Sequence, residues 1–241
     1  MKIYLKLAAA LMPLFVASYA AKADEAASAP AAPKMPVVFV QTVSTEDPSG
    51  YATWVAKGNE QFKAAGGPEQ FTHVYRGVIA GEDSGKVYAV RFGDSCEILS
   101  GQTAALMKSP AHAEIGAHLD VIRKLGPSFL LKAVYFEGGY GGEWLYITDA
   151  QVKDEPGYVK AMGDLRALFD SHGLKDIKIN VYRVIAGRSN HSHEVVISAP
   201  TEERSAVLMD SITAPWMADW LAGLAKVRTV VANGIYRDIS K

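Results

Sequence analysis

The stretch Gly50–Arg76, GYATWVAKGNEQFKAAGGPEQFTHVYR, decides the fold because it returns later in the chain as Gly157–Arg183, GYVKAMGDLRALFDSHGLKDIKINVYR. The initial Gly-Tyr, a central phenylalanine and the final Val-Tyr-Arg keep one offset of 107 residues (183 − 76). Unrelated segments would not hold glycines, aromatic residues and an arginine in register over this length. A repeat this long is typical of a duplicated domain rather than of a short solenoid unit. We therefore expect one fold unit to be present twice.

The register continues beyond this stretch with small shifts. The offset slips by one residue at the next glycine and returns to 107 where Lys86–Val90 is matched with His193–Ile197. It is 105 where Pro110–Glu114 is matched with Pro215–Asp219. Insertions and deletions in loops account for shifts of this size, so both units are expected to share one order of elements.

The N-terminal residues have the pattern of an export signal. Two lysines precede the apolar run Leu7–Ala20, and Ala21–Ala23 ends in the small-x-small pattern of a cleavage site. The run is shorter than the ~20 residues that span a bilayer. We expect residues 1–23 to be a signal peptide and the product to be periplasmic. Residues 24–36, rich in alanine and proline, are expected to form a flexible linker.

The composition excludes several classes of partner. The chain is 49% hydrophobic and 21% charged, with a net charge of −1, which gives no field for nucleic acid or anionic lipid. Cys96 is the only cysteine, so no internal disulfide can form. No nucleic-acid partner is expected, and no membrane association after signal cleavage.

Hydrophobic periodicity predicts the order β-α-β-β-α-β in each unit. In the first unit, 37–136, the predicted elements are strand 37–43, helix 50–65, strands 71–80 and 86–92, helix 103–125 with a break at Pro110, and strand 129–136. In the second unit, 143–241, they are strand 144–148, a helix that Gly173 ends, strands 177–185 and 194–199, helix 204–224, and strand 227–239. The glycine-rich residues 137–142 are predicted to link the units.

This order is that of the ferredoxin-like split motif, an α+β fold in which two helices cover one face of an antiparallel sheet. The other face of each sheet remains open, and two open faces in one chain should come together. We therefore expect two tandem ferredoxin-like units whose antiparallel sheets pack into one α/β barrel of the dimeric type.

The chain resembles the dimeric α/β-barrel superfamily, which includes antibiotic-biosynthesis monooxygenases, EthD-like proteins, haem-degrading monooxygenases and NIPSNAP-like proteins. Leu106–His112, LMKSPAH, resembles the recurring L-x-x-S-P-x-H stretch of that superfamily. Its counterpart Ser211–Met217 keeps the proline and loses the histidine. The resemblance implies that one polypeptide forms what relatives form as a homodimer, and hence that this protein is a monomer.

The repeated Tyr-Arg pair supplies the first candidate site residues. Strand alternation places Arg76 on the face opposite Tyr75, and Arg183 on the face opposite Tyr182. An arginine that continues an apolar face must find a carboxylate, carbonyl groups or a ligand anion. One interpretation is an arginine that meets an acidic ligand in a cavity; the other is a structural ion pair or a side chain that reaches water.

Further candidates come from the resemblance and from the aromatic residues. Haem-degrading members ligate iron through a histidine on the second helix, and His112 lies in the similar stretch; a histidine that is exposed or caps a helix is the alternative. Trp54 could line an apolar pocket or belong to the core. The pair His191 and His193 could bind a metal weakly but is more typical of a solvated turn. No metal and no cofactor are expected.

Three functions remain open at this point, and the sequence does not decide whether the protein is an enzyme. The preferred one is an exported protein that binds a small apolar or acidic ligand or serves as a scaffold, because no acid–base constellation is evident. The second is a cofactor-independent, monooxygenase-like enzyme for a small apolar or aromatic substrate. The third is a haem-handling protein that uses His112.

Overall fold

A computed structural model describes residues 35–68, 71–139, 142–187 and 189–240. The predicted signal peptide, nearly all of the predicted linker 24–36 and residues 140–141 of the predicted link lie outside these ranges.

Each half contains the predicted order of elements. In the first half these are β1 (Val37–Ser44), α1 (Pro48–Ala64), β2 (Thr72–Ile79), the 3-10 turn η1 (Gly81–Asp83), β3 (Val87–Gly93), α2 (Cys96–Lys108), α3 (Pro110–Ile122) and β4 (Lys124–Phe136). In the second half they are β5 (Trp144–Val152), α4 (Glu155–Ser171), β6 (Lys178–Gly187), β7 (His193–Ala199), α5 (Glu202–Ile212), η2 (Pro215–Met217), α6 (Ala218–Leu224) and β8 (Arg228–Asp238).

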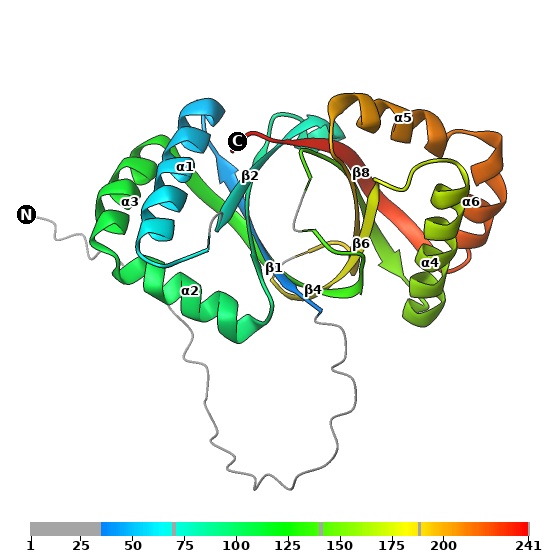
Figure 1. Ribbon diagram of the computed structural model, residues 1–241, viewed down its shortest axis with the longest axis horizontal. Coiled ribbons are helices and arrows are strands. Elements are labelled where there is room, and N and C mark those ends of the chain that lie inside the picture. The colour runs from blue at the N-terminus through cyan, green and yellow to red at the C-terminus, as the bar shows by residue number, and fades with distance from the viewer. Residues whose placement is uncertain (1–34, 69–70, 140–141, 188, 241) are drawn as a thin grey trace, which may run out of the picture. The chain divides into compact units, whose positions relative to one another are not determined.

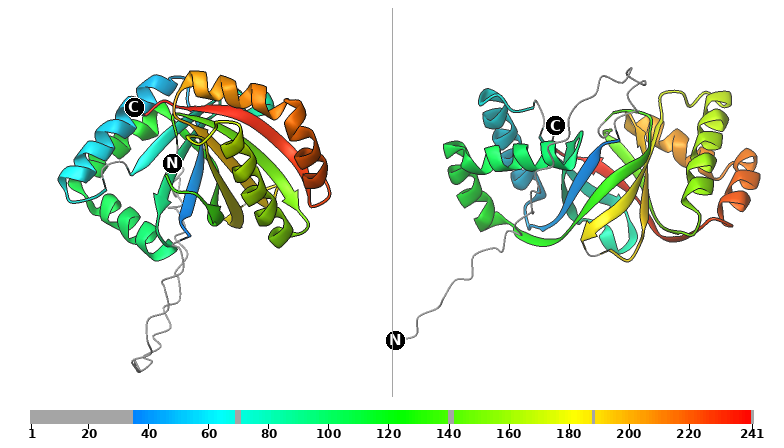
Figure 2. Two further views of the ribbon diagram at one scale, coloured as in Figure 1. Left: turned by 45° about the vertical axis from the view of Figure 1, so that its right-hand side comes forward. Right: turned by 90° about the horizontal axis from the view of Figure 1, so that it is seen from below.

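The eight strands form one closed antiparallel barrel in the order β1-β3-β2-β8-β5-β7-β6-β4. Each half contributes a ferredoxin-like sheet, and hydrogen-bonded pairs β2–β8 and β4–β6 join the two sheets at their edges. The predicted fold class is confirmed, but the open faces enclose a lumen instead of pressing together. Helices α1–α3 cover one side of the barrel and α4–α6 the opposite side (Figures 1 and 2).

A helix cap explains why each copy of the repeated stretch begins with glycine. The Asp47 carboxylate caps α1 by accepting a hydrogen bond from Gly50 N at 2.9 Å, and Asp154 caps α4 in the same way through Gly157 N at 3.1 Å. A Cβ atom on either glycine would collide with the capping carboxylate. The same cap therefore demands glycine twice.

The second helical region of the first half differs in detail from the prediction. The predicted helix 103–125 already begins at Cys96, because Ser95 Oγ caps it by accepting a hydrogen bond from Ile98 N at 3.1 Å. It is divided at Pro110, as predicted. It ends at Ile122, and β4 starts earlier than predicted, because Lys124 and Leu125 pair with β1.

The register of β3 and β7 corrects the alignment of the two halves. Val40 pairs with Val90, and Ile147 pairs with Val196, so Val90 corresponds to Val196 at an offset of 106 (196 − 90), not 107. A shift of one residue matters because neighbouring strand residues point to opposite faces. The predicted match of Lys86–Val90 with His193–Ile197 is therefore wrong: it equates lumen-facing residues with helix-facing ones.

Apolar side chains bury the helices against the outside of the barrel. In the second half a large core gathers around fully buried residues of α4 and β6, among them Tyr158, Met162, Phe169 and Ile179. Since these contacts occupy the outer faces of the strands, the inner faces are left to form the lumen. Within the described ranges, no helix combines the length and the apolar character that crossing a bilayer requires.

Candidate functional site

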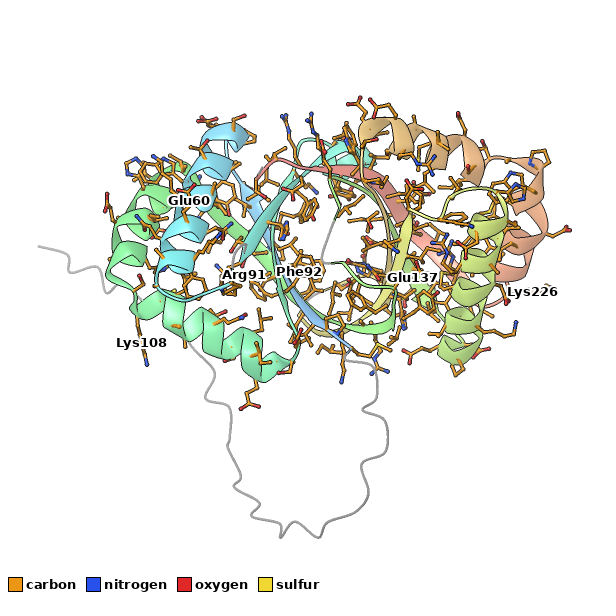
Figure 3. The ribbon with its side chains drawn as sticks, viewed as in Figure 1. Glu60, Arg91, Phe92, Lys108, Glu137 and Lys226 are labelled. Atoms are coloured by element: carbon orange, nitrogen blue, oxygen red, sulfur yellow. The ribbon has the colours of Figure 1, made fainter. Side chains whose placement is uncertain are left out.

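The barrel lumen is a cavity of about 1430 Å³. Its middle is lined by aliphatic side chains from five strands: Val38, Val40, Val90, Leu131, Leu145, Ile147 and Val196. Figure 3 labels two neighbours on β3 that show the alternation: Phe92 lies on the lumen side and Arg91 on the helix side. Large, mostly apolar cavities with a few polar groups are the usual form of small-molecule sites.

Three ionisable groups meet at one end of the lumen. Asp149 near the end of β5 is paired in register with Glu194 at the start of β7, and both side chains line the lumen. His191, in the connection between β6 and β7, lies between them. Its Nε2 is 3.0 Å from Glu194 Oε1, and its Nδ1 is 3.5 Å from Asp149 Oδ2. The side chains of His191 and Glu194 are only 6% and 8% exposed.

Burial and charge shift the ionisation of this cluster. Burial, together with the charge of Glu194, raises the pKa of Asp149 to about 7, although His191 opposes the shift. Burial tends to lower the pKa of His191, but the hydrogen bond and the charge of Glu194 outweigh it, so that this pKa is raised. The cluster therefore binds protons at a pH where an exposed carboxylate is ionised.

Two phenols line the lumen at the same end. The rings of Tyr88 and Tyr236 meet edge to face with centroids 5.7 Å apart, and Tyr236 Oη donates a 3.4 Å hydrogen bond to Asp83. Lys86 Nζ lies 2.6 Å from the other oxygen of Asp83. Burial and the charge of Asp83 raise the pKa of both phenols, so they remain hydrogen-bond donors at neutral pH. The opposite end is also polar, with Asn180 and Ser198.

The repeated Tyr-Arg pair is divided between the two faces of the barrel wall. Tyr75 and Tyr182 line the lumen, and burial raises the pKa of Tyr75 well above its usual value. Arg76 and Arg183 point outward and are exposed. Arg183 Nη1 lies 3.3 Å from Glu155 Oε1, which matches the structural ion pair that the sequence left as an alternative.

The other two predicted ligand-binding residues lie in the helix layer, outside the lumen lining. The Trp54 ring packs against His118 with centroids 3.8 Å apart and the planes tilted by 36°, and Lys57 Nζ lies 4.2 Å from the Trp54 ring centroid. His112, on α3, is half-buried, and burial together with the charges of Arg91 and Arg123 lowers its pKa.

The sequence interpretation missed Asp149 and Glu194 and read His191 as part of a solvated turn. In the structure His191 is buried, and His193 belongs to a separate contact on the helix side, 2.8 Å from Glu155. The sequence did contain a signal, because the two halves differ at these positions. By the correct offsets, the counterparts of Asp149 and Glu194 in the first half are Thr42 and Tyr88. Two carboxylates thus face the lumen at positions where the first half has a threonine and a tyrosine.

Neither a family model nor a curated protein matches the chain. Among solved structures, a "putative monooxygenase" from Lactobacillus acidophilus is similar with a TM-score of 0.55 at 11% identity, over 85% of this chain and 93% of that one. A "putative monooxygenase" from Fusobacterium nucleatum has the same score and identity over 86% and 93%. A "putative chlorite dismutase" follows with a TM-score of 0.50 at 11% identity, over 86% and 96%. These likenesses show the fold alone, an α/β barrel of the dimeric type.

Proposed function

We propose that the barrel lumen binds a small, largely apolar molecule whose polar group reaches the end that carries His191. The observation that carries this proposal is the cavity of about 1430 Å³ with an aliphatic middle and polar groups at its ends. A wall of valine, leucine and isoleucine gains free energy when an apolar ligand replaces water, at roughly 25 cal/mol per Å² of apolar surface.

The polar end favours a neutral ligand over an acidic one. Asp83, Asp149 and Glu194 line it, and the described lining sets against them one lysine, Lys86, and one histidine, His191. A ligand carboxylate would meet like charges there. The phenols of Tyr88 and Tyr236, in contrast, each have one O–H group, now directed to Asp83, that can turn to a carbonyl or hydroxyl group of a ligand.

The test is to fill the lumen and measure the binding of a neutral apolar dye, Nile red, by fluorescence. Val90 and Val196 occupy corresponding positions on opposite walls, so V90W/V196W narrows the middle of the lumen from both sides. The control Val207→Trp adds the same bulk on α5, where Val207 is 40% exposed. We expect the double variant to lose at least tenfold in dye affinity and the control to keep it. Equal affinity in a double variant that folds, judged by circular dichroism, contradicts the proposal.

A second candidate is the cofactor-independent oxygenase. In such a reaction a CH2 group beside an aromatic ring loses a proton, and dioxygen then places one oxygen atom as a carbonyl and releases the other as water. The carboxylate, imidazole and phenol groups at one end of an apolar lumen favour this candidate, and two similar structures are named "putative monooxygenase". Oxygen uptake with anthrone-like and phenolic substrates tests it. Turnover that is lost in Tyr88→Phe supports it, and no uptake with any of them favours binding alone.

The haem-handling function requires His112, which is not part of the lumen lining, and we do not propose that function.

We also propose that the two halves arose by tandem duplication, which the repeated sequence and the repeated order of elements support. We further propose that the chain is a monomer exported to the periplasm. Light scattering of the purified protein tests the first of these two points. N-terminal sequencing from a periplasmic extract tests the second, with cleavage expected after Ala23.

A further inference from the structure

The three ionisable side chains at one end of the lumen have the geometry of a metal site. One donor atom each from Asp149, His191 and Glu194 can be chosen so that all three lie within 4.8 Å of one another. Donors that share an ion at ~2.1 Å and at angles of 90–110° are about 3.0–3.4 Å apart. His191 Nε2 and Glu194 Oε1 are already 3.0 Å apart, so small side-chain movements would close the set around one ion.

The charge of these side chains is a second, independent reason to expect a bound cation. Asp149 and Glu194 face the same lumen, and among the described residues no lysine or arginine forms an ion pair with either. The nearest cation on the wall, Lys86, is engaged by Asp83. His191 is one imidazole between two carboxylates, so the ionised trio keeps a net negative charge even when His191 is protonated, and charge removed from water is costly. A bound cation would relieve this cost.

The surroundings of His191 fit a ligand histidine. Its Nδ1 faces Asn190 Oδ1 at 3.2 Å, and this amide oxygen accepts. Nδ1 therefore donates, and a metal ion would take the place of the proton that Nε2 shares with Glu194 Oε1 in the metal-free protein. Ligand histidines are commonly oriented in this way through their other ring nitrogen. The Phe129 ring packs at a right angle to the imidazole, with the ring centroids 6.1 Å apart.

We propose that Asp149, His191 and Glu194 bind one divalent first-row transition-metal ion. One imidazole and two carboxylates suit manganese, iron(II) or zinc better than calcium or magnesium, which prefer oxygen donors alone. The remaining coordination positions face the lumen. The site belongs to one half only, because Thr42 and Tyr88 stand at the positions of the two carboxylates in the other half. The proposal differs from the sequence expectation of no metal, and it does not depend on a lumen ligand.

The experiment is a calorimetric titration of the full chain, stripped with a chelator, with Mn²⁺ and with Zn²⁺ at pH 7.5. We expect one ion per chain in the wild type and a loss of at least 100-fold in affinity in Glu194→Gln and in Asp149→Asn. The control Asp83→Asn removes a carboxylate from the same end of the lumen but outside the trio, and should keep its affinity within about threefold.

Circular dichroism and the unfolding midpoint of each metal-free variant show whether it is folded. If neither ion binds the wild type, or if Glu194→Gln and Asp149→Asn bind as tightly as the wild type, the proposal is overturned. The manganese complex of the wild type should also show the electron paramagnetic resonance spectrum of an immobilised ion, and Asp149→Asn should show only that of the hydrated ion. Dye binding, measured separately, reports on the proposed lumen function whatever the metal result.

Discussion

Replacement of Asp149 by asparagine should stabilise the metal-free protein at neutral pH. The folded-state pKa of Asp149 is raised from 3.8 to about 7, chiefly by burial. Between these two values the unfolded chain releases a proton that the folded chain keeps, so stability falls as the pH rises through this window. Asparagine does not ionise and escapes this loss.

The size of the effect follows from the shift. About three pKa units at 1.36 kcal/mol each give an upper bound of about 4 kcal/mol at pH 7.5. His191 loses a neighbouring carboxylate in the variant, which reduces the gain. We therefore expect Asp149→Asn to be roughly 2–4 kcal/mol more stable than the wild type at pH 7.5, and within about 1 kcal/mol of it at pH 4.5.

Urea unfolding at the two pH values, in the presence of a chelator, measures this difference. Asp83→Asn is the matched control and should have the opposite sign, because hydrogen bonds from Lys86 and Tyr88 outweigh the effect of burial and lower the pKa of Asp83. If metal-free Asp149→Asn is less stable than the wild type at pH 7.5, the account of the cluster as a repulsive, buried pair of carboxylates is wrong.

Three further predictions concern the framework. Hydrogen bonds from His73 and Ser240 outweigh burial and lower the pKa of Asp238. The ionised Asp238 carboxylate should therefore stabilise the fold above about pH 4, and this stabilisation should disappear as the pH falls through the folded-state pKa. Urea unfolding of Asp238→Asn should lack this acid-dependent loss. Gly157→Ala and Asp154→Ala should each cost about 1 kcal/mol in urea unfolding, and the double variant less than their sum; strict additivity would contradict the cap collision. Arg183→Met should leave Nile red binding unchanged; a tenfold loss would return that arginine to the ligand site.

Much of the fold could be predicted from the sequence because its signals are local. The cap that excludes a side chain at Gly50 and Gly157, and the proline that divides the helical region at Pro110, each mark an element boundary directly. The order of elements and the closed barrel then follow from hydrophobic periodicity and from the presence of two units. The later start predicted for β4 was wrong because Lys124 and Leu125 belong to a strand through their pairing with β1, which is not a local signal.

The site was harder to predict because it depends on register. The sequence shows the one-residue slip at a glycine after Arg76, but two apolar strands can be matched at either offset, and the return to 107 misassigned which residues face the lumen. The wrong offset matches Glu194 with Val87, which packs on the helix side, instead of with Tyr88, which lines the lumen. Asp149 lies just beyond the predicted strand 144–148, where a polar residue is typical of a turn; in the structure β5 continues to Val152.

The central claim is that ligands bind inside the barrel, with their polar group toward His191. A crystal structure of the protein with bound Nile red tests it most directly. We predict that the dye contacts Val40, Val90 and Val196 in the middle of the lumen and that its carbonyl oxygen accepts a hydrogen bond from Tyr88 or Tyr236. A dye bound between the helices or on the outer surface, with only water in the lumen, would contradict the claim.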